Sequence, residues 1–67
     1  MKQFFKERNV ADQKLIEDYQ TEYLRVNGKP AIAVKVVNGF QVTNHFEITE
    51  QLTKEELNDI VNWLKSS

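Results

Sequence analysis

His45 is the only histidine in the chain and the residue best suited to acid–base or metal chemistry. Glu47 follows two positions later and Thr43 precedes it by two, so on a β-strand all three side chains share one face. Zinc sites in proteins use a larger set of ligands than one imidazole and one carboxylate. Nucleophilic catalysis needs a hydroxyl activated by a neighbouring base, and nothing in the sequence around Thr43 indicates one. We therefore expect no catalytic residue and no metal site.

The remaining chemistry-bearing residues do not form a recognisable site either. Glu55 and Asp59 are four positions apart, but two carboxylates on a helix bind a hard cation only weakly. Gly28 and Gly39 stand alone at predicted turns, so there is no glycine-rich phosphate loop. The chain has no cysteine, which excludes disulfides and thiolate zinc sites. We expect no cofactor and no enzymatic activity.

A β-hairpin over residues 31–48 would position His45 and its neighbours. Asn38-Gly39 lies between apolar, β-branched runs, a pattern typical of a tight turn. A two-residue loop would place Lys35 opposite Val42 and mix polar and apolar groups on one face. A three-residue loop with Gly39 as a bulge groups the apolar side chains together, and a slip of one residue would turn a strand over. We therefore predict a buried face made of Ile32, Val34, Val36, Phe40, Val42 and Phe46.

The opposite face of the predicted hairpin is mixed in character. Antiparallel sheets commonly keep one face in water, which is the simpler interpretation of this side. Small side chains at Ala31, Ala33 and Thr43 would also let another surface approach closely. The face contains Ala31, Ala33, Lys35, Val37, Gln41, Thr43, His45 and Glu47.

A helix is predicted over residues 9–26, before the hairpin. Asn9 or Asp12 can serve as its N-cap, and Asn27-Gly28 followed by Pro30 would end it. Leu24 lies off the apolar stripe, so residues 23–26 remain open to a second interpretation as a third strand in a meander. Residues 1–8 either extend the helix or form a separate arm. The stripe consists of Leu15, Ile16, Tyr19, Tyr23 and Val26 at helical spacing.

A second helix is predicted after Thr53, where Thr53-Lys54-Glu55-Glu56 has the pattern of a capping box. Leu52 and Leu57 flank the box as a hydrophobic staple. Trp63 lies off the centre of the apolar stripe, either sealing the core at its rim or anchoring a partner. The stripe consists of Leu57, Ile60, Val61 and Leu64.

The expected fold is a small α+β domain covering residues 1–67: an N-terminal helix, an antiparallel β-hairpin that could be a three-stranded meander, and a capped C-terminal helix. A chain this short buries little surface, and a two-stranded sheet has unpaired edges, so we expect a homodimer. The sequence shows neither a secretory signal nor a transmembrane run. We expect no membrane association and a cytoplasmic location.

The formal net charge of −1 argues against a protein that binds nucleic acid or membranes electrostatically. Polar residues on the hairpin keep a nucleic-acid-binding regulator as the alternative, although the chain lacks a lysine or arginine cluster for phosphates. We expect a non-catalytic protein-interaction module, such as a regulator, inhibitor or assembly subunit. The residues expected to contact the partner protein are Phe4, Phe5, Ala31, Ala33, Val37, Thr43, His45 and Trp63.

Overall fold

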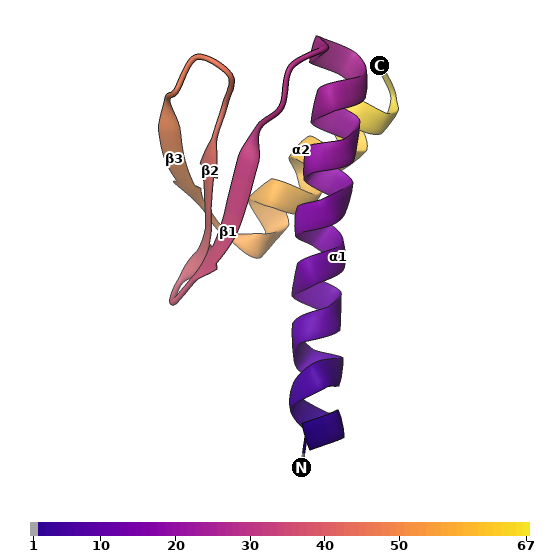
Figure 1. The fold of residues 1–67 in the computed structure, drawn as a ribbon, viewed down its shortest axis with the longest axis vertical. Coiled ribbons are helices and arrows are strands. Elements are labelled where there is room, and N and C mark those ends of the chain that lie inside the picture. Colours follow the sequence, from indigo (N-terminus) through magenta and orange to yellow (C-terminus); the bar gives the residue numbers. More distant parts are fainter. Residues whose placement is uncertain (1) are drawn as a thin grey trace.

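The computed structural model describes the backbone of residues 2–67 and the side chains of residues 11–67. Three antiparallel strands form one sheet in the order β1-β2-β3, and two helices pack beside it (Figure 1). The first helix contacts β1 and the second contacts β2 and β3. This arrangement confirms a small α+β domain and selects the meander over the simple hairpin. The elements are α1 (Lys2–Asn27), β1 (Ile32–Val36), β2 (Gly39–Thr43), β3 (Thr49–Leu52) and α2 (Lys54–Lys65).

α1 is one continuous helix, so residues 23–26 are helical and the third strand comes from Thr49–Leu52 instead. The helix also extends back to Lys2, so the predicted N-caps, Asn9 and Asp12, lie inside it. The C-terminal end of α1 is where the sequence predicted it. Gly28 has a positive φ of 72° and donates its N–H to the Leu24 carbonyl at 2.8 Å, which closes the last turn.

The strand register differs from both of the registers considered from the sequence. Val36 pairs with Gly39 and Ala33 with Val42, so the loop consists of Val37-Asn38. β1 is therefore turned over relative to the prediction. Ala31 and Ala33 are each 5% exposed, whereas Ile32, Val34 and Phe46, which we predicted to be buried, are exposed. The prediction was right for Phe40 and Val42, which are buried on the inner face of β2.

The packing of α1 against β1 explains why the alanines face inward. Tyr19 of α1 belongs to the same buried cluster as Ala31 and Ala33, and small side chains let the helix backbone approach the strand.

The third strand explains why position 39 is a glycine. A Cβ at this position would collide with the Leu52 carbonyl of β3, so glycine is needed where the third strand passes rather than in the turn.

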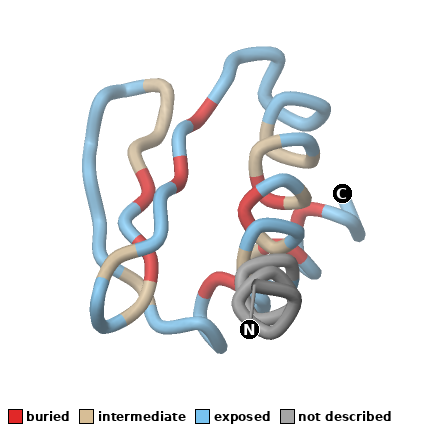
Figure 2. The backbone as a smooth tube through the Cα atoms, turned by 60° about the horizontal axis from the view of Figure 1, so that its bottom comes forward, coloured by how far each residue is buried: buried red, intermediate tan, exposed pale blue. Residues whose placement is uncertain are grey.

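The core lies between the helices and the inner face of the sheet (Figure 2). α2 begins with the predicted capping box: the Thr53 hydroxyl accepts from the Glu56 N–H at 3.1 Å, and the Glu56 carboxylate accepts from the Thr53 N–H at 2.8 Å. No helix in the described part of the chain is long and apolar enough to cross a membrane. The buried residues are Ile16, Tyr19, Ala31, Ala33, Phe40, Val42, Leu57, Val61 and Leu64.

Candidate interaction site

The loop between β2 and β3 is a compact turn built around the side chain of Asn44. Its Oδ1 accepts from the backbone N–H groups of Phe46 at 2.9 Å and Ile48 at 3.1 Å. Glu47 adopts a positive φ of 66°, and its N–H donates to the Asn44 carbonyl. Asparagine favours such turns because its short side chain can replace a backbone acceptor. The loop therefore holds His45 and Phe46 in fixed positions.

A contact with α1 orients the His45 ring. The Tyr23 hydroxyl lies 2.6 Å from Nδ1 of His45, and the backbone N–H of His45 donates to the same hydroxyl oxygen at 3.3 Å. The hydroxyl can donate its proton to Nδ1 or accept a proton from it, so the direction of this bond depends on the tautomer of the ring. The Phe46 ring stacks against His45 with centroids 4.0 Å apart, and Phe46 is 70% exposed.

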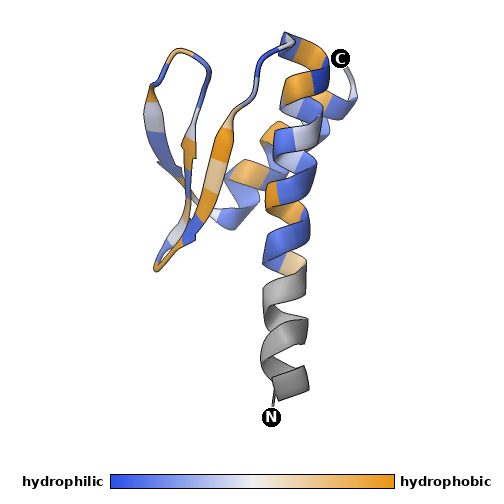
Figure 3. Ribbon diagram, viewed as in Figure 1, coloured by the Kyte–Doolittle hydropathy of each residue, from blue (hydrophilic) through white to orange (hydrophobic). Residues whose placement is uncertain are grey.

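A shallow groove of about 310 Å³ lies between this loop and the start of β1. Ile32 lines the groove from β1, and His45 lines it from the loop. Val34 continues the apolar surface along β1, where hydropathic colouring shows a largely apolar strand (Figure 3). We call Ile32, Val34, His45 and Phe46 the outer-face patch. The residues that line the groove are Lys29, Pro30, Ile32, Thr43, Asn44, His45 and Glu47.

Two of the polar side chains that line the groove, those of Thr43 and His45, are engaged in structural hydrogen bonds. The Thr43 hydroxyl lies 3.0 Å from the Thr49 hydroxyl, and Nδ1 of His45 is taken by Tyr23. Within residues 11–67, no three histidine, aspartate or glutamate side chains converge on a common point for a metal ion. The groove offers mainly apolar contact, with Nε2 of His45 and the charged side chains of Lys29 and Glu47 as its further polar groups.

The residues that we expected to contact a partner do not gather on one surface. Thr43 and His45 meet at the groove, but Val37 stands 94% exposed at the hairpin tip, and Trp63 is an exposed residue of α2. Ala31 and Ala33 are buried, and the surface that approaches them closely is α1 of the same chain. The side chains of Phe4 and Phe5 lie outside the described residues.

Sequence reasoning missed Ile32, Val34 and Phe46 as surface residues because it assigned them to the core. The alternation in Ala31-Ile32-Ala33-Val34 separates a face of small residues from a face of large ones. Only the position of α1 decides which of those faces is covered.

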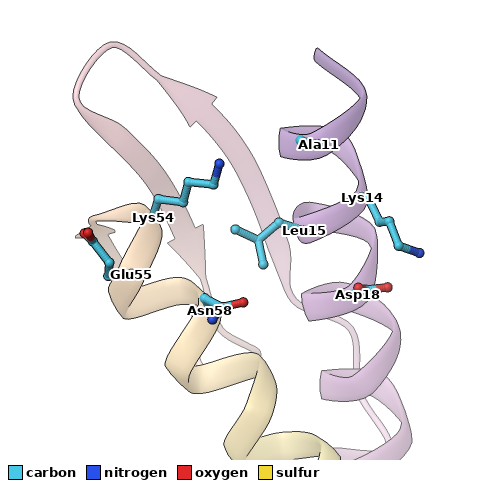
Figure 4. A pocket seen from close by; sticks show the side chains of 7 residues that line it. All are labelled: Ala11, Lys14, Leu15, Asp18, Lys54, Glu55 and Asn58. Carbon is cyan, nitrogen blue, oxygen red and sulfur yellow. The ribbon is translucent and has the colours of Figure 1, made fainter. Parts of the chain in front are cut away.

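A second groove, of about 560 Å³, lies between α1 and the first turns of α2 (Figure 4). Leu15 points from α1 toward α2, while Lys14 points away from it. Lys54 at the rim lies 3.8 Å from Asp12 of α1, an ion pair that links the two helices. The rim of this second groove is charged, and Leu15 is the largest apolar side chain that lines the groove. The outer-face patch exposes three large apolar side chains, Ile32, Val34 and Phe46, and is the better candidate site.

Compared with protein-family models, with curated proteins and with solved structures, the chain shows no match. Its function must therefore be inferred from the residues of the site.

Proposed function

We propose that this chain is a non-catalytic protein-interaction module that binds another protein through the outer-face patch. The observation that supports this function is the exposure of large apolar side chains on β1 and on the β2–β3 loop. Ile32 is 61% exposed on β1, and Phe46 is exposed on the opposite loop. Exposed apolar side chains that gather on a small soluble domain usually mark a partner surface.

The shape and charge of the site favour a protein over other ligands. The groove is at the lower end of the volumes typical of small-molecule sites, roughly 300 to 1,000 Å³, and its apolar surface continues beyond it to Val34. Glu47 lines the groove together with Lys29, so no net positive charge is available for a phosphate backbone. A broad, weakly charged, apolar surface is suited to the side chains of a protein partner.

Affinity capture from a lysate of the native host, with quantitative mass spectrometry, tests this function. The test variant combines Ile32→Lys with Phe46→Ser, which changes two exposed side chains of the patch. Val37→Ser is the matched control, because it removes an exposed apolar side chain at the hairpin tip, outside the patch. We expect one or more proteins to be recovered with the wild type and the control but lost with the double variant. Equal recovery with all three proteins would contradict the proposal.

A second copy of the chain is one protein that this surface could bind, in line with the homodimer expected from the chain length. Sedimentation of the wild type and the double variant at tens of micromolar, a range in which weak dimers form, identifies this case. A dimer of the wild type that the double variant loses would make the second copy the partner. A dimer that persists in the double variant would show that the copies meet elsewhere.

A further inference from the structure

β3 is the edge of the sheet that the described part of the chain leaves open. Only β2 pairs with β3, and Thr49, Glu50 and Gln51 are all exposed. The other edge is β1, where α1 packs against the strand and Ala33 is almost fully buried. The two edges are therefore unequal, and β3 is the one that an added strand could reach.

The backbone groups that face outward on β3 follow from the hydrogen-bond pattern. The N–H of Asn44 donates to the Ile48 carbonyl at 3.0 Å, so the backbone groups of Asn44 and Ile48 face each other just beyond the ladder, although the Ile48 N–H donates to Oδ1 of Asn44 and not to its carbonyl. Hydrogen-bonded and non-hydrogen-bonded pairs alternate along antiparallel strands. Glu50 therefore turns its backbone groups toward β2, whereas Thr49 and Gln51 turn theirs outward. The N–H and C=O groups of Thr49 and Gln51 have no strand partner and could receive one.

Glu50 determines which strand this edge accepts. It pairs with Val42, so its side chain lies on the face of the sheet that the helices cover, yet it is exposed because β3 is an edge. In a strand added antiparallel to β3, the residue opposite Glu50 would form a non-hydrogen-bonded pair, in which side chains come closest. A lysine or arginine there is favourable, and an aspartate or glutamate is unfavourable.

The same carboxylate disfavours pairing with a second copy of β3. In an antiparallel β3–β3 pair, all the outward groups are matched only when Thr49 faces Gln51 of the other copy. That register places Glu50 directly opposite the second Glu50, which is a repulsive arrangement. A shift by two residues avoids the repulsion but leaves part of the edge unpaired. Charged side chains on an edge strand commonly prevent self-association in this way.

We infer that the β3 edge binds an extended segment of a different protein, which adds a fourth strand antiparallel to β3 and places a basic side chain opposite Glu50. The inference rests on the proposed function, because both require a protein partner, but it names a separate surface. The backbone groups of Thr49 and Gln51 would thus hydrogen-bond to the backbone of the segment, and Glu50 would attract its basic side chain.

Fluorescence anisotropy with short labelled peptides tests the charge preference. The probes alternate threonine and valine and differ only in the central residue, which is lysine, threonine or glutamate. We expect the wild type to bind the lysine peptide about fivefold more tightly than the glutamate peptide. Glu50→Lys should reverse the order. Equal binding of all three peptides by the wild type, or an unchanged order in Glu50→Lys, would overturn the inference.

A backbone variant tests whether the peptides bind at the edge. Gln51→Pro removes an outward N–H without removing a bond to β2, a position where edge strands tolerate proline. It should abolish binding of every peptide, while circular dichroism confirms that the protein is folded. Binding that Gln51→Pro leaves intact in the folded protein would place the peptides elsewhere and refute the inference. If this variant unfolds, the reversal in Glu50→Lys decides the question.

Sedimentation tests the role of Glu50 against self-pairing. Glu50→Thr should self-associate at a concentration at which the wild type is monomeric. Wild-type dimers in which the amides of Thr49 and Gln51 are protected from exchange would identify the second copy as the occupant and overturn the inference.

The Ile32→Lys and Phe46→Ser double variant separates this inference from the proposed function. It should bind the peptides as the wild type does, because neither Ile32 nor Phe46 belongs to β3. Peptide binding without any patch-dependent partner in the lysate would refute only the proposed function. Patch-dependent capture without any peptide preference would refute only the inference.

Discussion

The hydroxyl oxygen of Tyr23 lies 2.6 Å from Nδ1 of His45, which joins the last turns of α1 to a loop 22 residues further along the chain. The same hydroxyl accepts the backbone N–H of His45, so one side chain satisfies two groups of the loop. His45 in turn supports the exposed ring of Phe46. The outer-face patch therefore depends on a residue of α1 that is not part of it.

Tyr23→Phe removes this link while keeping the ring. It leaves the N–H and Nδ1 of His45 without their partner, so we expect the free energy of unfolding to fall by about 1 kcal/mol. Urea unfolding measures the change, and amide exchange at His45 should become faster. Thr21→Ala, an exposed substitution on the same helix, is the control and should change stability little. Unchanged exchange at His45 in Tyr23→Phe would show that the hydroxyl does not hold the loop.

The two glycines should respond very differently to alanine. At Gly39 a new Cβ would meet the Leu52 carbonyl, and the φ of 141° is unfavourable for alanine, so we expect a loss of several kcal/mol or failure to fold. At Gly28 no atom lies within 4 Å of the new Cβ, so only the positive φ opposes the substitution, at about 1 kcal/mol. Thermal unfolding of both variants checks this order. A Gly39→Ala protein as stable as Gly28→Ala would contradict the observed packing of β3.

Adjacent residues of β1 provide a direct test of the register. Ala33 is buried against the helices, so Ala33→Leu should destabilise the protein by about 1 to 3 kcal/mol through overpacking. Val34 is exposed on the other face, so Val34→Leu should change stability by less than about 0.5 kcal/mol. Urea unfolding of the two variants measures the change in the free energy of unfolding that each one causes. The opposite order would restore the register predicted from the sequence.

Tyr19 should make stability fall at alkaline pH. Burial raises the pKa of its phenol above the ordinary value of 10.0, and the neighbouring Tyr23 and Glu50 raise this pKa further. The unfolded chain then loses the proton at a lower pH than the folded protein does. The stability that this raised pKa contributes is complete below about pH 10 and is lost as the pH rises through the pKa of Tyr19 in the folded protein. Urea unfolding across this range should show a shallower decline for Tyr19→Phe, and identical slopes would contradict the prediction.

The sequence by itself determined where α2 begins and where α1 ends. The capping box at Thr53 and Glu56 involves groups only three positions apart, so the pattern specifies the start of α2 directly. Gly28 ends α1 for an equally local reason. The buried positions on β2, Phe40 and Val42, were also predictable from their alternation with polar residues.

The tertiary structure decided the register of β1 and, with it, the candidate site. Ile32 and Val34 are more apolar than Ala31 and Ala33, so the local pattern favoured burying the larger pair. The close approach of α1 instead requires the small side chains to face it, which leaves the large ones exposed. Glycine is likewise required at position 39 because a Cβ there would collide with the Leu52 carbonyl of β3. Both facts depend on segments distant in sequence, whose contacts no local pattern records.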